Sequence, residues 1–246
     1  MSDLEGGAPP PPDGPGPRGS DDPPPGVNEG HLEVPRSARF AWLGQPTSAV
    51  REVWLVCHGH RQLAGRFLRR FLPLRSDARL LVAPEALNRF YLAQAGSHGQ
   101  ESKVGGTWMT REDRRWEIRD YVRYLDALAE RIFAAVDRGR VRLRALGFSQ
   151  GAATAARWTA YGRTAVDELV LWSGGLPPDL DLDRWDGRLR DTRITLVRGE
   201  QDDLLSPEAM DETEERLRSR DLAFRRLTHP GGHELDAAVL DRIASG

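Results

Sequence analysis

The hydrophobic pattern of the chain consists of short apolar or largely apolar runs separated by longer amphipathic stretches. Short apolar runs are typical of strands that are buried on both faces of a sheet. The run V-W-L-V-C at 53–57 is the clearest of them. On this pattern we expect strands at 40–43, 53–57, 78–83, from 143 up to 148, 169–172, 194–197 and 223–227.

Helices are predicted between these runs by apolar residues at spacings of three and four. The longest pattern extends from Ile118 to Val136, with Thr110 and Asp113 as its start signal and Gly139 near its end. Shorter helices are expected at about 63–71, 152–160, 206–218 and from 234 onward. Residues 86–109 show no clear period and predict a long ligand-covering connection, and a polar link follows 175.

Strands that alternate with helices predict the α/β class, with a mostly parallel central sheet and helices on both faces. Residues 1–36 are dominated by Pro and Gly and predict a disordered tail, because they offer too little apolar surface to offset their ordering entropy. We therefore expect a single domain at 37–246. In a sheet of this kind, the chemistry gathers beyond the carboxyl ends of the strands.

Composition narrows the class of protein further. The chain has 246 residues, a hydrophobic fraction of 39 % and a net charge of -2, which fits one substantial core and argues against a nucleic-acid ligand. The single cysteine, Cys57, excludes an internal disulfide and is expected to be a core residue, which favours a cytoplasmic location. Neither a signal peptide nor a membrane span is visible in the sequence.

The motif G-F-S-Q-G at 147–151 lies between a predicted strand and a predicted helix, which is the layout of a nucleophile elbow. Such a turn presents the Ser149 hydroxyl above the sheet, and Gly147 and Gly151 leave room for the close backbone approach. The alternative is a glycine-rich turn that carries a solvated serine.

A serine hydroxyl needs a base, and the base needs an acid that holds its tautomer. In the chain order serine, acid, histidine, only His229 and His233 follow the candidate acids Asp202 and Asp203. We favour His233, because Gly231 and Gly232 let the backbone bend before it, and we expect His229 to shape the loop. Asp202 is preferred to Asp203, and a surface-loop role for His233 is the alternative.

Catalysis at a carbonyl also needs two N–H donors for the developing oxyanion. The backbone N–H groups of Gln150 and His60 are the candidates. His58 and His60 are not accompanied by a ligand cluster in the sequence, so no metal and no cofactor is expected. The side chains that are candidates for an acyl pocket, or alternatively pack under the long connection, are Phe90, Tyr91, Trp108, Met109 and Trp172.

Four segments together resemble the α/β-hydrolases, and specifically their small carboxylesterase/phospholipase and acyl-thioesterase-like branch. They are V-W-L-V-C-H-G-H, G-F-S-Q-G, G-E-Q-D-D and G-G-H-E-L, and the resemblance covers about 38–246. It implies the α/β-hydrolase fold, a triad of Ser149, Asp202 and His233, and an oxyanion hole formed by the N–H groups of His60 and Gln150. Arg61 departs from the pattern H-G-x-G of that branch, and the region after Glu85 does not map onto a characterised pocket.

The function expected from these features is that of a serine hydrolase that cleaves carboxylic esters of small to medium acyl chain. The same triad would serve an acyl-protein thioesterase, a lysophospholipase, an acyltransferase or a peptidase. A non-catalytic binding protein on the same fold is the alternative from another class. The expected partner is a small-molecule ester or thioester, without nucleic acid, and the oligomeric state is open.

Overall fold

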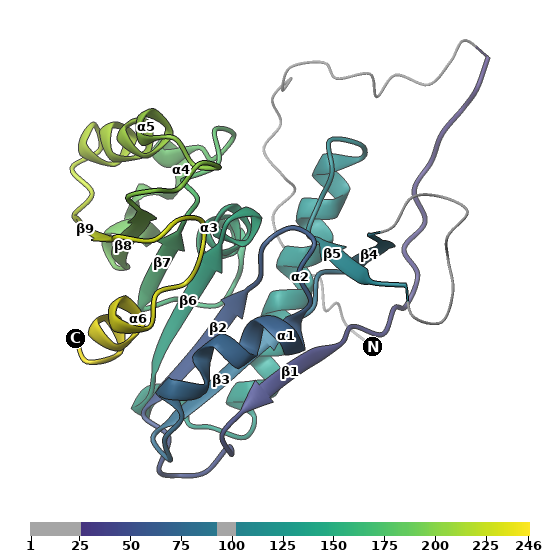
Figure 1. The fold of residues 1–246 in the computed structure, drawn as a ribbon. Coiled ribbons are helices and arrows are strands. Elements are labelled where there is room, and N and C mark those ends of the chain that lie inside the picture. The colour runs from purple at the N-terminus through teal and green to yellow at the C-terminus, as the bar shows by residue number, and fades with distance from the viewer. Residues whose placement is uncertain (1–25, 93–101) are drawn as a thin grey trace.

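A seven-stranded sheet with the order β1-β3-β2-β6-β7-β8-β9 forms the centre of the computed structural model, which describes residues 26–92 and 102–246 (Figure 1). The edge strand β1 is antiparallel to β3, and all other pairs in this sheet are parallel. Its strands are β1 Phe40–Leu43, β2 Glu52–Cys57, β3 Arg79–Pro84, β6 Arg142–Phe148, β7 Glu168–Trp172, β8 Arg193–Gly199 and β9 Phe224–His229.

Helices cover both faces of the sheet (Figure 1). One face carries α2 Arg114–Phe133, α3 Gln150–Tyr161, α4 Leu182–Arg190 and α5 Pro207–Arg218. The other face carries α1 Ala64–Leu68, the 3₁₀ helix η1 Arg69–Leu74 and α6 Ala237–Ala244. The α/β architecture predicted from the alternation of elements is therefore confirmed.

The alternation of side chains along each buried strand divides the core into two clusters. In β2, Val53, Leu55 and Cys57 pack under α2 and α3, whereas Trp54 and Val56 pack under α1 and α6. All five side chains are fully buried, because a central parallel strand has a helix layer on each face. This explains why the run is apolar throughout and does not alternate with polar residues.

Two predictions of local structure are wrong. The polar link after 175 contains α4, whose N-cap Asp181 accepts a hydrogen bond from the Arg184 N–H and whose Leu182 and Leu189 are buried. The long connection contains a separate hairpin of β4 Asn88–Tyr91 and β5 Val104–Thr107. Its segment 93–101 lies outside the described residues, as does the predicted tail up to residue 25.

The start of α2 also differs from the prediction. The helix begins at Arg114, and the Thr110 N–H binds the carboxylate of Glu117. Thr110 is therefore bound to a side chain in the first turn of the helix, and the N-cap position is occupied by Asp113.

The described part of the predicted tail, from 26 to 36, contains no helix or strand but contacts the rest of the chain. The His31 ring stacks on Trp116 at a centroid distance of 4.2 Å, and Glu33 pairs with Arg123 on α2 at 2.8 Å. Arg36 donates a hydrogen bond to the carbonyl of Leu87. The domain division at residue 36 stays a prediction.

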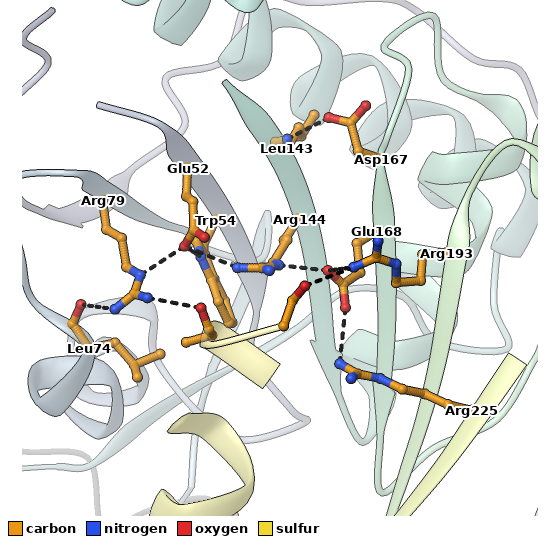
Figure 2. Close-up of polar contacts among 12 residues, drawn as sticks. Glu52, Trp54, Leu74, Arg79, Leu143, Arg144, Asp167, Glu168, Arg193 and Arg225 are labelled. Atoms are coloured by element: carbon orange, nitrogen blue, oxygen red, sulfur yellow. Dashed lines mark hydrogen bonds and ion pairs between the residues drawn. The ribbon is translucent and has the colours of Figure 1, made fainter. Parts of the chain in front are cut away.

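A buried ion network crosses the amino-terminal half of the sheet (Figure 2). It lies away from the carboxyl ends of the strands, where β2 ends at Cys57 and β6 ends at Phe148. Arg144 on β6 is fully buried and lies 2.7 Å from a carboxylate oxygen of Glu168 and 3.0 Å from one of Glu52. Glu168 also faces Arg225 at 3.3 Å. Arg79 extends the network, since it binds Glu52 at 2.8 Å and the α6 carbonyl of Ala244 at 2.9 Å.

The network predicts a stability difference between two glutamates. Glu168→Ala leaves the buried Arg144 without its closest carboxylate, and we expect the free energy of unfolding to fall by about 3–5 kcal/mol. The matched control is Glu212→Ala on the exposed face of α5, which should change it by less than about 0.5 kcal/mol. Urea unfolding of both variants measures the difference, and equal effects would contradict this role of Glu168.

Candidate active site

Five neighbouring parallel strands, in the order β2-β6-β7-β8-β9, end at one edge of the sheet. Register pairs show this directly, because Cys57 pairs with Gly147 and Phe148 pairs with Trp172. Gly199 pairs with His229 at the far side of the same edge. The residues that follow these strands, from His58 to His233, are thus placed along one rim, as expected for this class of sheet.

Ser149 occupies the turn between β6 and α3, which confirms the expected layout of strand, turn and helix. Its φ of 55° and ψ of -120° lie outside the regions that ordinary residues favour. The turn is held because the Ser149 N–H donates to the carbonyl of Trp172 at 2.8 Å. Strained backbone of this kind is typical of functional turns.

Glycine is required on both sides of this serine by close backbone contact. A Cβ built on Gly147 would lie 2.1 Å from the carbonyl oxygen of Gly151, and one on Gly151 would lie 2.2 Å from that of Cys57. A Cβ on Gly174, after β7, would lie 2.6 Å from the carbonyl oxygen of Ser149. The elbow therefore packs backbone against backbone on each side.

His233 and Asp202 form a contact across the ends of β8 and β9. His233 Nδ1 lies 2.9 Å from one carboxylate oxygen of Asp202 and 3.0 Å from the other. The His233 ring lies 5.0 Å from the ring of Phe148, the residue before Ser149. Because Nδ1 faces the carboxylate, Nε2 is the nitrogen that remains for a substrate or a hydroxyl.

The carboxylate of Asp202 is buried and held by backbone donors. The N–H groups of Leu204 and Leu205 donate to one of its oxygens at 3.0 and 2.9 Å. Burial raises the pKa of Asp202, but the hydrogen bonds outweigh this and hold the pKa below its usual range. Asp203 is exposed, and Asp202 is the aspartate that contacts His233. The catalytic roles of Asp202 and His233 stay predictions.

The two candidate oxyanion donors come from two segments that meet at the serine. A Cβ on Gly59 would lie 3.2 Å from the Cβ of Ser149, which places the loop of His60 beside it. Gln150 is the first residue of α3, at the positive end of the helix dipole. Within the described residues, neither the His60 nor the Gln150 backbone N–H has a hydrogen-bond acceptor.

The hairpin β4–β5 fixes the loop that carries His60. The Arg61 N–H donates to the carbonyl of Gly106 at 2.8 Å, and the Gly106 N–H donates to the carbonyl of Gln62 at 2.9 Å. Arg61 itself has a φ of 67°, in the left-handed region that favours glycine. The arginine thus adopts the backbone conformation that a glycine would adopt without strain.

The candidate pocket residues differ in burial. Trp108 and Trp172 are 1 % and 0 % exposed, and their indole N–H groups donate to the carbonyls of His58 and Glu234 at 2.8 and 2.9 Å. Both pack in the core clusters, whereas Met109 is partly buried. A pocket role stays a prediction for all three, and core packing accounts for the position of the two tryptophans.

The side chain of Gln150 makes contacts that sequence reasoning did not foresee. It donates to the carbonyl of Met109 at 2.8 Å and to the Thr107 hydroxyl at 3.0 Å, and it accepts from the Trp108 N–H at 3.1 Å. It thereby ties the elbow to the end of β5. The only signal in the sequence is the choice of glutamine after the serine, which does not name these partners.

The remaining histidine and cysteine side chains beside the site were considered as metal ligands and as nucleophiles. Among the described residues, no group of three or more His, Cys, Asp or Glu side chains could hold a metal ion. His60 stacks on Phe90 at 5.3 Å, and burial lowers its pKa. Cys57 is buried, and burial raises the pKa of its thiol, so it stays protonated.

No described helix is both long and apolar enough to cross a bilayer.

Comparison with known proteins gives a family and a fold. The family model described as "Serine hydrolase (FSH1)" matches residues 55–237. No curated protein matches the sequence.

Among solved structures, the acyl-protein thioesterase 2 of Zea mays is 17 % identical, with a TM-score of 0.63 over 85 % of this chain and 97 % of that one. A phospholipase/carboxylesterase of Dyadobacter fermentans is 16 % identical, with a TM-score of 0.60 over 87 % and 98 %. A carboxylesterase of Bacillus cereus is 14 % identical, with a TM-score of 0.61 over 85 % and 92 %. These likenesses show the α/β-hydrolase fold.

The contacts around the elbow predict that its first glycine cannot be replaced. In Gly147→Ala, the new Cβ would meet the backbone of Gly151, which cannot move without displacing α3, and we expect a loss of about 3 kcal/mol or more in unfolding free energy. Gly65→Ala in α1 is the matched control, because nothing lies within 4 Å of its Cβ position and helix propensity should stabilise it by about 0.5–1 kcal/mol. Thermal and urea unfolding compare the two, and a Gly147→Ala protein as stable as wild type would refute the packing argument.

Proposed function

Since this chain belongs to the serine hydrolase (FSH1) family, we propose that it hydrolyses carboxylic esters of small to medium acyl chain, with Ser149 as the nucleophile, His233 as the general base and Asp202 as the acid that orients it. The observation that carries the proposal is the contact of His233 Nδ1 with the buried Asp202 carboxylate, at 2.9 and 3.0 Å, on the rim that also presents Ser149. Structures of similar fold include a carboxylesterase and a phospholipase/carboxylesterase.

The proposed reaction has two halves. The Ser149 oxygen attacks the ester carbonyl carbon while His233 Nε2 accepts its proton, and Asp202 stabilises the imidazolium through Nδ1–H. The N–H groups of His60 and Gln150 bind the negative oxygen of the tetrahedral intermediate. The imidazolium then returns the proton to the leaving alkoxide. In the second half a water molecule, activated by the same histidine, releases the acid and restores Ser149.

The low pKa of Asp202 supports this assignment, since the acid of a triad must be ionised when the histidine takes up a proton. The same geometry would serve a thiolate leaving group, and the fold is similar to that of an acyl-protein thioesterase. A thioester or lysophospholipid substrate is therefore the second candidate. A cytoplasmic location and the absence of a nucleic-acid ligand are part of the proposal and are supported by the single buried cysteine and the net charge of -2.

Replacement of the nucleophile is the direct test. Ser149→Ala should lower kcat on p-nitrophenyl butyrate by about 10⁴-fold or more, because both the attack and the acyl-enzyme are lost. A fluorophosphonate probe should label the wild-type protein at Ser149 only. Ser219→Ala, at the exposed end of α5, is the control and should keep wild-type turnover. Near-normal hydrolysis by Ser149→Ala would refute the proposal, and an unlabelled wild-type protein would favour a binding role.

Two neighbouring aspartates form a matched pair. Asp202→Asn should lower kcat by about 10³–10⁴-fold, because an amide cannot stabilise the imidazolium, whereas the exposed Asp203→Asn should stay within about threefold of wild type. The folded-state pKa of Asp202 lies below its unfolded value of about 3.9, so its ionised form stabilises the fold at neutral pH. This contribution should disappear as the pH falls below about 4, and urea unfolding of wild type and Asp202→Asn across pH 3–7 measures it. The reverse order of kcat for the two variants would assign the acid to Asp203.

Substrate choice is tested by p-nitrophenyl esters of increasing chain length and by an S-acyl thioester of matched length. The proposal expects kcat/KM to be highest for short to medium acyl chains and lower for the thioester. A maximum at palmitate, or a clear preference for the thioester, would favour the second candidate.

A further inference from the structure

We propose that His58 is a positioning residue for this reaction, whose buried ring holds the peptide bond between Gly59 and His60 so that the His60 N–H faces the substrate oxygen. The inference rests on the proposed function, in which that N–H is one of the two oxyanion donors. His58 is fully buried directly after β2, and none of its atoms is needed for the chemistry itself.

The hydrogen bonds of the ring define its tautomer. The backbone N–H of Ala86 lies 3.1 Å from His58 Nε2, and an amide N–H can only donate, so Nε2 is the accepting nitrogen. The proton therefore lies on Nδ1, which is 2.8 Å from the carbonyl oxygen of Gly59 and donates to it. Burial keeps the pKa of His58 below its ordinary value, although the Gly59 bond and Glu85 oppose this, and the neutral ring fits both partners.

The peptide group between Gly59 and His60 connects the His58 ring to the proposed oxyanion donor. In a trans peptide bond the carbonyl and the N–H point in opposite directions. The Gly59 carbonyl is directed to the buried His58 ring, so the His60 N–H of the same peptide is directed away from the ring. Gly59 lies against the nucleophile, since a Cβ there would be 3.2 Å from the Ser149 Cβ. The His60 N–H thus points away from the ring, and the peptide that carries it begins at a residue in contact with Ser149.

The ring makes the shorter of two hydrogen bonds to the Gly59 carbonyl, at 2.8 Å, and the Gln62 N–H makes the other at 3.2 Å. Glycine allows a wide range of backbone angles, so a peptide that follows Gly59 rotates more easily than most. The Gly59 N–H is held by the Gln62 side chain at 2.9 Å, and the Arg61 N–H by the Gly106 carbonyl at 2.8 Å. These bonds hold the flanking peptides, whereas the peptide that carries the donor is held by the His58 ring and, at the longer distance, by the Gln62 N–H.

The other contacts of His58 are structural. The Ala86 bond joins the end of β2 to the segment after β3, and the Trp108 indole donates to the His58 carbonyl at 2.8 Å. The two ring nitrogens thus perform separate tasks, which two isosteric substitutions separate. The side-chain amide of asparagine reaches about the position of Nδ1, and that of glutamine reaches about the position of Nε2.

The experiment compares His58→Asn with His58→Gln. His58→Asn keeps a donor for the Gly59 carbonyl and loses the Ala86 acceptor, so its kcat should stay within about threefold of wild type. His58→Gln keeps the Ala86 acceptor and leaves the Gly59 carbonyl with only the longer bond from the Gln62 N–H. Because loss of a complete oxyanion donor costs about 10²–10³-fold in kcat, a misdirected donor should lower kcat by about 10–100-fold.

The readouts distinguish positioning from folding. In His58→Gln, KM for p-nitrophenyl butyrate should change by less than about threefold, whereas the affinity for an alkyl boronic acid, which forms a tetrahedral adduct with the serine, should fall with kcat. Thermal unfolding of both variants is measured in parallel. His58→Asn should lose at least as much stability as His58→Gln while it retains turnover, and this order supports the proposal.

Other results overturn it. Wild-type kcat in His58→Gln, a loss of kcat in both variants that follows their loss of stability, or a raised KM with unchanged kcat would each show that the Gly59 bond does not position a donor. These outcomes leave the proposed function intact when Ser149→Ala is inactive. Turnover that survives in Ser149→Ala would instead refute the proposed function, and the positioning role with it.

Discussion

The close backbone contact around Ser149 is the constraint on which the site depends. Strands β2 and β6, the turn, helix α3 and the segment after β7 approach so closely that a Cβ at Gly147, Gly151 or Gly174 would lie within 2.6 Å of a neighbouring backbone oxygen. This packing forces Ser149 into a backbone conformation that a free chain avoids, and the rest of the fold supplies the free energy that holds it there. The half-buried serine keeps its position at the turn because its backbone is not free to relax.

Buried charged side chains lie in two separate parts of the sheet and are stabilised in different ways. Arg144, Glu168 and Glu52 meet in the amino-terminal half, where buried charges compensate one another and Arg79 binds the carbonyl of Ala244 at the end of α6 (Figure 2). At the carboxyl edge, by contrast, Asp202 is held by backbone N–H groups and by His233.

Neutral hydrogen bonds hold the remaining parts of the rim. The side chains of His58, Gln62 and Gln150 bind backbone groups of the loop after β2 and of the end of β5. Donors held by fixed hydrogen bonds need little reorganisation when charge develops on a bound carbonyl oxygen. The small hairpin β4–β5, which lies outside the main sheet, is therefore part of the support of the site.

Local pattern alone determined the strands and the elbow. A strand that is buried on both faces must be apolar throughout, and a turn with backbone contacts on both sides must have glycine at both positions. The strand β2 and the motif G-F-S-Q-G can therefore be recognised from the sequence. Only the tertiary structure shows that Asp202 contacts His233 while Asp203 is exposed, because adjacent residues of one type differ solely in the direction that the turn gives them. The same holds for α4, which packs against α3 and β8, and for Trp108 and Trp172, whose burial depends on the layers above them. The partners of His58 come from the loop after β2, the segment after β3 and the end of β5, and contacts between segments so far apart in the chain leave no periodic trace in the sequence.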